Sequence, residues 1–384
     1  MGILRVNQVS GIGTNGPVFD GVTKFDTQGY FVPPVGVTSD RSPAGITTVQ
    51  GSIRFNTDSQ KLEFFAQDQW FEMVIDTPAL AVGSNSEAGA RGLFAGGYAL
   101  SPTITNFNTI DYINISSTGN AITFGTLSEA TRNSIGACAS STRGLWGGGS
   151  AEPSTNSNTI DFVTISSTGD AIDFGDLTVA RRSATAVSNN TRGIWAGGRT
   201  PSQQNIIDYI TIASTGNAVN FGNISRSSVT SMTPVQSPTR GVWGGGYTPH
   251  INSIDFVTIS TLGDSTSFGN LTVARANGSG CSNATRGVFG GGSTPSFTNV
   301  IDYITIATLG NAVNFGNLSA AKSNISCCSS PVRGVFAGGY LSPSQTNVIE
   351  YVLISTQGNT VDFGDLTQAR LIKTAGCSNA HGGL

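Results

Sequence analysis

The chain has 384 residues, 50 glycines, 11% charged residues and a net charge of −3, a composition that suits strands joined by turns better than long helices. It contains no block of basic residues and no long apolar run, so we expect no nucleic-acid partner and no membrane insertion. The five cysteines have no CxxC spacing and only two histidines accompany them, so we expect no metal site and no cofactor.

Near the N-terminus, the stretch GSIRFNTDSQKLEFFAQDQW (residues 51–70) predicts a strand, a polar turn, a second strand and a further strand near Trp70. We assign residues 51–78 to a small β module. Residues 1–50 are expected to form a separate N-terminal segment, and residues 79–90 a linker.

From residue 91 onward, one motif recurs six times. The copies RGLFAGG, RGLWGGG, RGIWAGG, RGVWGGG, RGVFGGG and RGVFAGG begin at Arg91, Arg143, Arg192, Arg240, Arg286 and Arg333. Successive copies start 46 to 52 residues apart, a spacing typical of propellers and other repeat arrays with one supersecondary unit per repeat.

Each repeat is predicted to contain four short strands. In the fifth repeat these strands cover residues 276–283, 287–292, 300–307 and 312–318, and the sequence TLGN supplies a tight turn before the fourth. The third strand, VIDYITI, has apolar residues on both faces, as expected for a strand that lies between two neighbouring sheets.

The order of these features resembles the kelch repeat: a basic residue, a strand, a turn, apolar residues followed by Gly-Gly, a loop, and an acid next to an aromatic residue. The resemblance covers residues 91–384 and departs from the kelch pattern in the fourth strand, where NFG replaces the usual tryptophan. It implies an all-β fold, namely a six-bladed kelch-like β-propeller with four-stranded blades, preceded by the small β-rich N-terminal region.

Two N-terminal stretches, FDGVTKFDTQGYFVPPVG and SIRFNTDSQKLEFF, resemble N-terminal segments of tailed-phage fibre and virion structural proteins. The resemblance implies a structural protein of a marine tailed phage, assembled in the host cytoplasm, with residues 1–50 attaching it to the virion as a tail fibre, appendage or decoration. It also implies a homo-oligomer such as a trimer. The expected partners are other virion proteins and, for host attachment, a glycan or protein of the host surface. A cellular kelch scaffold for protein–protein interaction and a carbohydrate-active propeller enzyme remain as alternatives.

The repeated positions are interpreted as structural. The aromatic residue of each second strand is expected to pack between sheets. Cys138, Cys281 and Cys328 share one position with two valines, which indicates a requirement for a small apolar side chain. With His250 and His381 as the only histidines, neither a copper site nor a Ser-His-Asp arrangement is indicated, so we expect no catalytic residues.

The loops between the second and third strands, called here the variable loops, are the expected binding surface. From the last glycine of the second strand to the acid of the third strand, the distance varies from 9 to 14 residues. From the phenylalanine of the fourth strand to the arginine of the next repeat, it is always 18 or 19 residues. Because rigid scaffolds carry recognition on the loops that vary, we expect ligand contacts there, unless these side chains pack onto the rim. The candidates are Tyr98, Phe107, Arg199, Tyr247, His250, Phe297 and Tyr340.

Two further positions are predicted to pair. A basic residue precedes each first strand and an acid lies in each third strand, so we expect the pairs Arg181–Asp208, Arg275–Asp302 and Lys322–Glu350 to be buried. Residues 79–90 contain no basic partner for Asp111. The C-terminal stretch RLIKTAGCSNAH supplies Arg370 and repeats the first-strand pattern, which predicts that the C-terminal strand completes the first repeat and closes the propeller.

Overall fold

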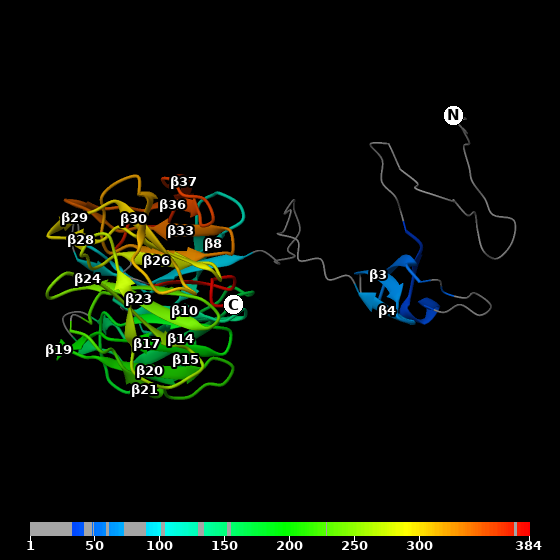
Figure 1. The fold of residues 1–384 in the computed structure, drawn as a ribbon, viewed down its shortest axis with the longest axis horizontal. Helices are drawn as coiled ribbons and strands as arrows, with labels where there is room; N and C mark the ends of the chain where they lie inside the picture. Colours follow the sequence, from blue (N-terminus) through cyan, green and yellow to red (C-terminus); the bar gives the residue numbers. More distant parts are fainter. Residues whose placement is uncertain are drawn as a thin grey trace, which may run out of the picture. The chain divides into compact units, whose positions relative to one another are not determined.

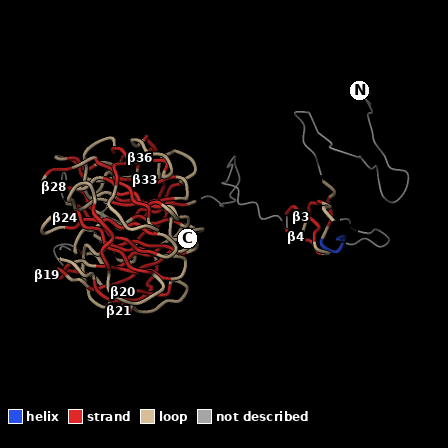
Figure 2. Tube along the Cα trace, in the orientation of Figure 1, coloured by secondary structure: helices blue, strands red, loops and turns tan. Residues whose placement is uncertain are grey.

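The structure is a computed structural model that describes residues 33–41, 48, 50–58, 61–72, 90–100, 104–129, 134–151, 155–227, 229–371 and 375–384. The chain divides into two compact units, Met1–Thr77 and Pro78–Leu384 (Figure 1). Among the described residues both units consist of strands and loops, apart from one helical turn, η1 (Thr38–Arg41), in the first unit (Figure 2). The expectation of an all-β chain is therefore confirmed.

The first unit contains one four-stranded sheet, in the order β1 (Val35–Gly36), β2 (Ile53–Asn56), β3 (Lys61–Ala66) and β4 (Gln69–Glu72). The β1–β2 pair is parallel and the other pairs are antiparallel. The sheet thus starts upstream of residue 51, inside the range 1–50 that was expected to be a separate segment. Residues 1–32, and residues 79–89 of the expected linker, lie outside the described residues.

A buried carboxylate organises this small sheet. Glu63 is fully buried and forms ion pairs with Arg41 and Arg54, and it accepts a hydrogen bond from Asn56 at 2.7 Å. The hydrogen bond from Arg41 is the main cause that lowers the pKa of Glu63, so this carboxylate stays charged.

In the second unit, the described residues form six four-stranded antiparallel sheets. Sheet 1 contains β38 (Gly376–Ser378), β5 (Arg91–Ala95), β8 (Thr109–Asn114) and β9 (Ile122–Thr126). Sheet 2 contains β10 (Gly136–Ala139), β11 (Arg143–Gly147), β14 (Thr159–Thr164) and β15 (Ile172–Asp176). Sheet 3 contains β16 (Thr185–Ser188), β17 (Arg192–Ala196), β20 (Ile206–Thr211) and β21 (Val219–Asn223).

The remaining sheets repeat this order. Sheet 4 contains β22 (Thr233–Gln236), β23 (Arg240–Gly246), β24 (Ile251–Thr258) and β25 (Thr266–Asn270). Sheet 5 contains β26 (Ser279–Ser282), β27 (Arg286–Gly290), β30 (Val300–Thr305) and β31 (Val313–Asn317). Sheet 6 contains β32 (Ser326–Ser329), β33 (Arg333–Ala337), β36 (Val348–Leu353) and β37 (Val361–Asp365).

The first strand of each sheet contacts the first strands of its neighbours. β10 contacts β16, β16 contacts β22, β22 contacts β26, β26 contacts β32, β32 contacts β38, and β38 contacts β10. Four-stranded antiparallel sheets that meet through their first strands are consistent with a fold of the β-propeller type.

Sheet 1 is built from both ends of the second unit. β38 pairs with the inner edge of β5 and places Cys377 opposite Leu93. The same register places Cys138 opposite Leu145 in sheet 2. The C-terminal strand therefore occupies, in sheet 1, the position that β10 occupies in sheet 2.

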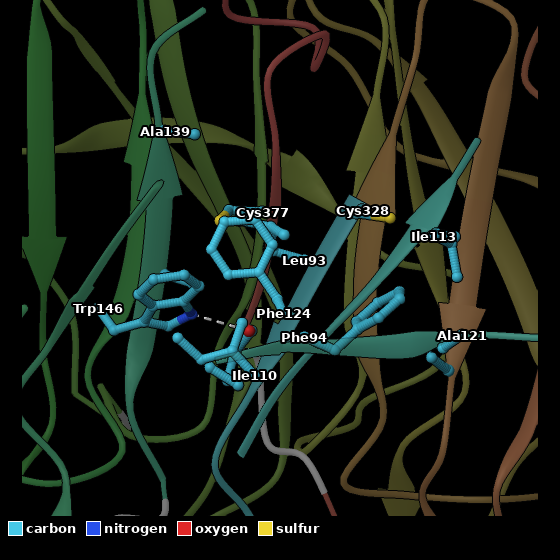
Figure 3. Packing of buried hydrophobic residues seen from close by; sticks show 14 of the residues in the cluster. Leu93, Phe94, Ile110, Ile113, Ala121, Phe124, Ala139, Trp146, Cys328 and Cys377 are labelled. Atoms are coloured by element: carbon cyan, nitrogen blue, oxygen red, sulfur yellow. Dashed lines mark hydrogen bonds between the residues drawn. The ribbon is translucent and has the colours of Figure 1, made fainter. Parts of the chain in front are cut away.

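The core lies between the sheets. The second-strand aromatic residues are completely buried, and Figure 3 shows Phe94 and Trp146 among the side chains around Leu93, Cys328 and Cys377. The indole nitrogen of Trp146 donates a hydrogen bond to the carbonyl oxygen of Ala375 at 3.1 Å. These aromatic residues are core, as predicted, and no sugar can stack on them.

Glycine is required where neighbouring sheets approach each other. A Cβ atom on Gly125, in the fourth strand of sheet 1, would lie 2.1 Å from the carbonyl oxygen of Gly169 in sheet 2. This contact explains why glycine follows the phenylalanine of the fourth strand, because a side chain there would separate the two sheets. Gly148, in the Gly-Gly doublet, has φ +69° and its Cβ would lie 2.6 Å from the carbonyl oxygen of Arg181.

Candidate functional site

The structure brings together the basic and acidic residues that the sequence analysis paired. The nearest nitrogen–oxygen distances are 2.7 Å for Arg181–Asp208, 2.8 Å for Arg275–Asp302, 2.6 Å for Lys322–Glu350 and 2.8 Å for Arg370–Asp111. None of these side chains is more than 1% exposed. A further pair, Arg226–Asp255, forms although its arginine is displaced by two positions in the sequence.

In four of these pairs the acid also accepts a hydrogen bond from a residue that follows the preceding sheet. The hydroxyl of Thr178, which follows sheet 2, donates to Asp208 of sheet 3 at 2.7 Å. The hydroxyl of Thr367, which follows sheet 6, donates to Asp111 of sheet 1 at 2.8 Å. Burial favours the neutral form of Glu350, yet the charge of Lys322 holds the pKa of this carboxyl below its usual value. These acids therefore serve as structural anchors.

The arginine that opens each second strand has a role that the sequence analysis did not assign. Its guanidinium lies 4.4–4.9 Å from the ring centroid of the aromatic residue in the third strand of its own sheet. It also donates a hydrogen bond to a carbonyl oxygen that follows the third strand of the next sheet, for example Arg143 to Ile212 at 2.8 Å. Arg333 of sheet 6 donates in the same way to Ile115 of sheet 1, at 3.0 Å. The sequence contained a sign of this role, because the arginine occurs in all six copies of the motif.

The five cysteines are free and buried, and they line one small cavity of about 30 Å³ together with His381. Burial raises the pKa of Cys138, Cys327, Cys328 and Cys377, so these thiols stay protonated. Within the described part of the chain, no group of three or more His, Cys, Asp or Glu side chains is arranged to hold a metal ion.

His381 anchors the C-terminus inside this cavity. Its Nε2–H donates to the carbonyl oxygen of Ala139 at 2.8 Å, and its Nδ1 accepts from the N–H of Gly383 at 3.0 Å. This pattern requires the neutral imidazole. Burial lowers the pKa of His381 to about 4, in agreement with that assignment.

Among the described residues, the variable loop of five of the six repeats forms a short hairpin. The hairpins are β6–β7 (Tyr98–Ala99, Thr105–Asn106), β12–β13 (Ser150–Ala151, Thr155–Asn156), β18–β19 (Arg199–Thr200, Ser202–Gln203), β28–β29 (Ser293–Thr294, Ser296–Phe297) and β34–β35 (Tyr340–Leu341, Ser344–Gln345). In sheet 4, longer β23 and β24 pair across this region instead. The variable loops therefore differ in length mainly because the turn between the two short strands differs in length from one hairpin to the next.

A pocket of about 370 Å³, called here the arginine pocket, lies between the variable loops and the segments that precede the first strands. It is lined by Tyr98, Ile104, Ser134, Ser150, Arg182, Ser183, Arg199, Thr230, Ser231, Tyr247 and Asn277. These residues come from five different repeats, so the pocket exists only when the sheets are assembled.

Backbone hydrogen bonds connect part of the pocket wall from one repeat to the next. The N–H of Ser183 donates to Ser134 at 2.9 Å, that of Ser231 to Ser183 at 3.3 Å, and that of Asn277 to Ser231 at 3.0 Å. These four residues have φ between +57° and +59°, which a non-glycine residue adopts only when its surroundings enforce it. This part of the wall is therefore held by hydrogen bonds between neighbouring repeats.

The predicted contact residues divide into two groups. Tyr98, Arg199 and Tyr247 line the arginine pocket, and Tyr247 is 43% exposed. Tyr247 also contacts His250 edge-to-face, with ring centroids 5.1 Å apart. Arg182 belongs to the pocket and was missed, because no other repeat has a charged residue at its position.

The other candidates lie outside the pocket lining. Phe297 and Tyr340 pack against each other edge-to-face at 5.5 Å, and both are half-buried. Phe107 is half-buried, and its N–H donates to the carbonyl oxygen of Gly97 at 2.9 Å. Phe297 and Tyr340 therefore contact each other and do not line the arginine pocket.

No family model and no curated protein matches this chain. In the portion of the chain that the structure describes, no helix has the length and apolar character needed to cross a membrane.

Proposed function

We propose that this protein is a non-enzymatic structural protein of a tailed-phage virion, a fibre, appendage or decoration, that binds a host surface or a partner protein through a six-bladed kelch-like propeller. The six sheets would be the blades. Two contacts support a closed ring: β38 completes sheet 1, and Arg333 of sheet 6 donates to Ile115 of sheet 1.

The observation that carries the proposal is a division of roles: the repeated residues hold the sheets together, and an open pocket lies at the loops that connect the strands. Repeated arginines, acids, glycines and aromatic residues hold the sheets together. The variable loops and the segments before the first strands together line one open pocket, and Arg182 and Arg199 give it a character that the other repeats lack. A rigid frame with one variable, solvent-facing site is typical of a binding protein.

The ionisable groups support binding rather than catalysis. His381 is buried in structural hydrogen bonds, and the third-strand acids Asp111, Asp208 and Asp302 are held in ion pairs. The first unit, with its own sheet, supplies a separate body for attachment to other virion proteins.

The test is adsorption of the purified full-length protein to host cells. Replacing Tyr98 and Tyr247 with Ala should reduce adsorption, because both side chains line the pocket, while the melting temperature stays close to that of the parent. Leu309→Ala is the matched control, since this side chain is 59% exposed in the turn between β30 and β31 and away from the pocket lining. Adsorption that survives the double replacement would contradict the adhesive role.

A further inference from the structure

The basic residues of the second unit have partners, with two exceptions among those that the structure describes. The second-strand arginines contact an aromatic ring and a carbonyl oxygen, and the residues before the first strands pair with acids. In the described part of the chain, neither Arg182 nor Arg199 forms a side-chain hydrogen bond or an ion pair. Both line the arginine pocket.

These two arginines lie directly opposite each other. The N–H of Arg182 donates to the carbonyl oxygen of Arg199 at 3.2 Å, and the N–H of Arg199 donates back at 2.9 Å. Residues paired in this way place their side chains on the same face, and like charges in such a pair are destabilising. The equivalent bridges elsewhere carry no charge: Tyr98–Leu371, Thr230–Tyr247, Ala276–Ser293 and Ser323–Tyr340.

The pocket around them suits an anion that carries hydroxyl groups. None of the described residues that line it is acidic. Serine and threonine hydroxyls, the Asn277 amide and two tyrosines complete the lining, and these groups are suited to hydrogen bonds and ring contacts with a sugar. The volume of about 370 Å³ falls within the range of small-molecule sites.

We propose that the arginine pocket binds the carboxylate-bearing sugar of an acidic polysaccharide, with Arg182 and Arg199 holding the carboxylate. Planar guanidinium groups match the two oxygens of a carboxylate, and the bound anion removes the repulsion between the paired charges. This assignment rests on the proposed function in one respect: the polysaccharide would come from the host surface that the protein is proposed to bind.

The experiment is isothermal titration calorimetry of the full-length protein with glucuronate, glucose, acetate and inorganic phosphate. Glucuronate should bind more tightly than the other three, because only it combines the carboxylate with the sugar hydroxyls. Replacing either arginine should weaken glucuronate binding about tenfold, the effect expected for loss of a hydrogen bond to a charged group. Added salt should also weaken it.

The variant Arg182→Ala/Arg199→Ser reproduces the Ala276–Ser293 bridge that the chain already uses, so it should fold as the parent does. It should lose glucuronate binding and the rise in melting temperature that glucuronate causes in the parent. Lys61→Ala, which removes one positive charge from the first unit, is the matched control and should bind normally.

Equal binding of glucose, or unchanged binding by the double variant, would overturn the proposal. Equal binding of acetate or phosphate would also overturn it, since it would indicate a simple anion site. These outcomes are independent of particle assembly and host adsorption. The pocket assignment and the virion function can therefore fail separately.

Discussion

Arg275 and Asp302 illustrate how single residues hold the second unit together. Both side chains are at most 1% exposed, and Asp302 also accepts a hydrogen bond from Thr272 at 2.6 Å. A buried charge without its partner is strongly unfavourable, although the intact pair itself contributes little net stability. The pair therefore fixes the start of sheet 5 against its third strand, and the hydrogen bond from Thr272 links that strand to sheet 4.

Replacing Arg275 with Met should lower the free energy of unfolding by about 3–5 kcal/mol, because Asp302 would remain buried without its partner. Denaturant-induced unfolding of the full-length protein measures this change. The double variant Arg275→Met/Asp302→Leu should recover much of the loss. As a control, Lys61→Ala removes one member of an exposed pair and should cost no more than about 1 kcal/mol. A buried-pair variant as mild as this control would contradict the structural role.

His381 gives the protein a defined pH dependence. Its folded-state pKa is about 4, against 6.5 for an unperturbed histidine, so between these values the unfolded chain binds a proton that the folded protein does not. Stability should therefore fall as the pH falls through this window, by about 3 kcal/mol in total from this one group. The variant His381→Gln cannot titrate and should show a shallower loss from pH 6.5 to 4. Parallel stability curves for both proteins would contradict the burial of a neutral imidazole.

At the scale of elements, the strand pattern was predictable because it depends on local sequence. The expected strands of the fifth repeat correspond to β26, β27, β30 and β31, although each observed strand is shorter because its ends turn into loops. The pairing of β38 with β5 was also predictable, since Arg370 and Cys377 repeat positions that the other copies share.

Other features could not be derived from local pattern. The contact between Arg143 and Ile212 joins residues of different sheets, so it depends on how those sheets meet. Arg182 occupies a position where the copies share no residue type, and nothing in a single repeat shows that it faces Arg199. The short strands β28 and β29 were not predicted, because the sequence analysis used only the length of the variable loop that contains them.

Deleting residues 370–384 should unfold the second unit rather than fray one edge. The deletion removes β38, the partner of Asp111 and the side chain of His381 in one step, and leaves the inner edge of β5 unpaired. Circular dichroism and thermal unfolding would measure the effect. Deleting only Gly383 and Leu384 is the milder comparison, and it should retain the cooperative transition. A cooperative, parent-like transition after the longer deletion would contradict closure by the C-terminal strand.

At the scale of the whole molecule, the chain divides into two compact units with separate sheets. A chain starting at residue 79 should therefore be soluble, rich in strands and cooperatively unfolding. It should also fail to enter particles, because the attachment segment is missing. Sedimentation and thermal unfolding test the first expectation, and particle composition tests the second. An insoluble fragment would indicate that the N-terminal strands belong to the propeller.

The virion assignment is the central claim, and mass spectrometry of purified phage particles tests it most directly. Peptides from both units should be found in particles that band with infectivity in a density gradient, in a constant ratio to the major structural proteins. Absence from those particles, with the protein present only in the lysate of infected cells, would contradict the assignment and favour a cellular scaffold instead.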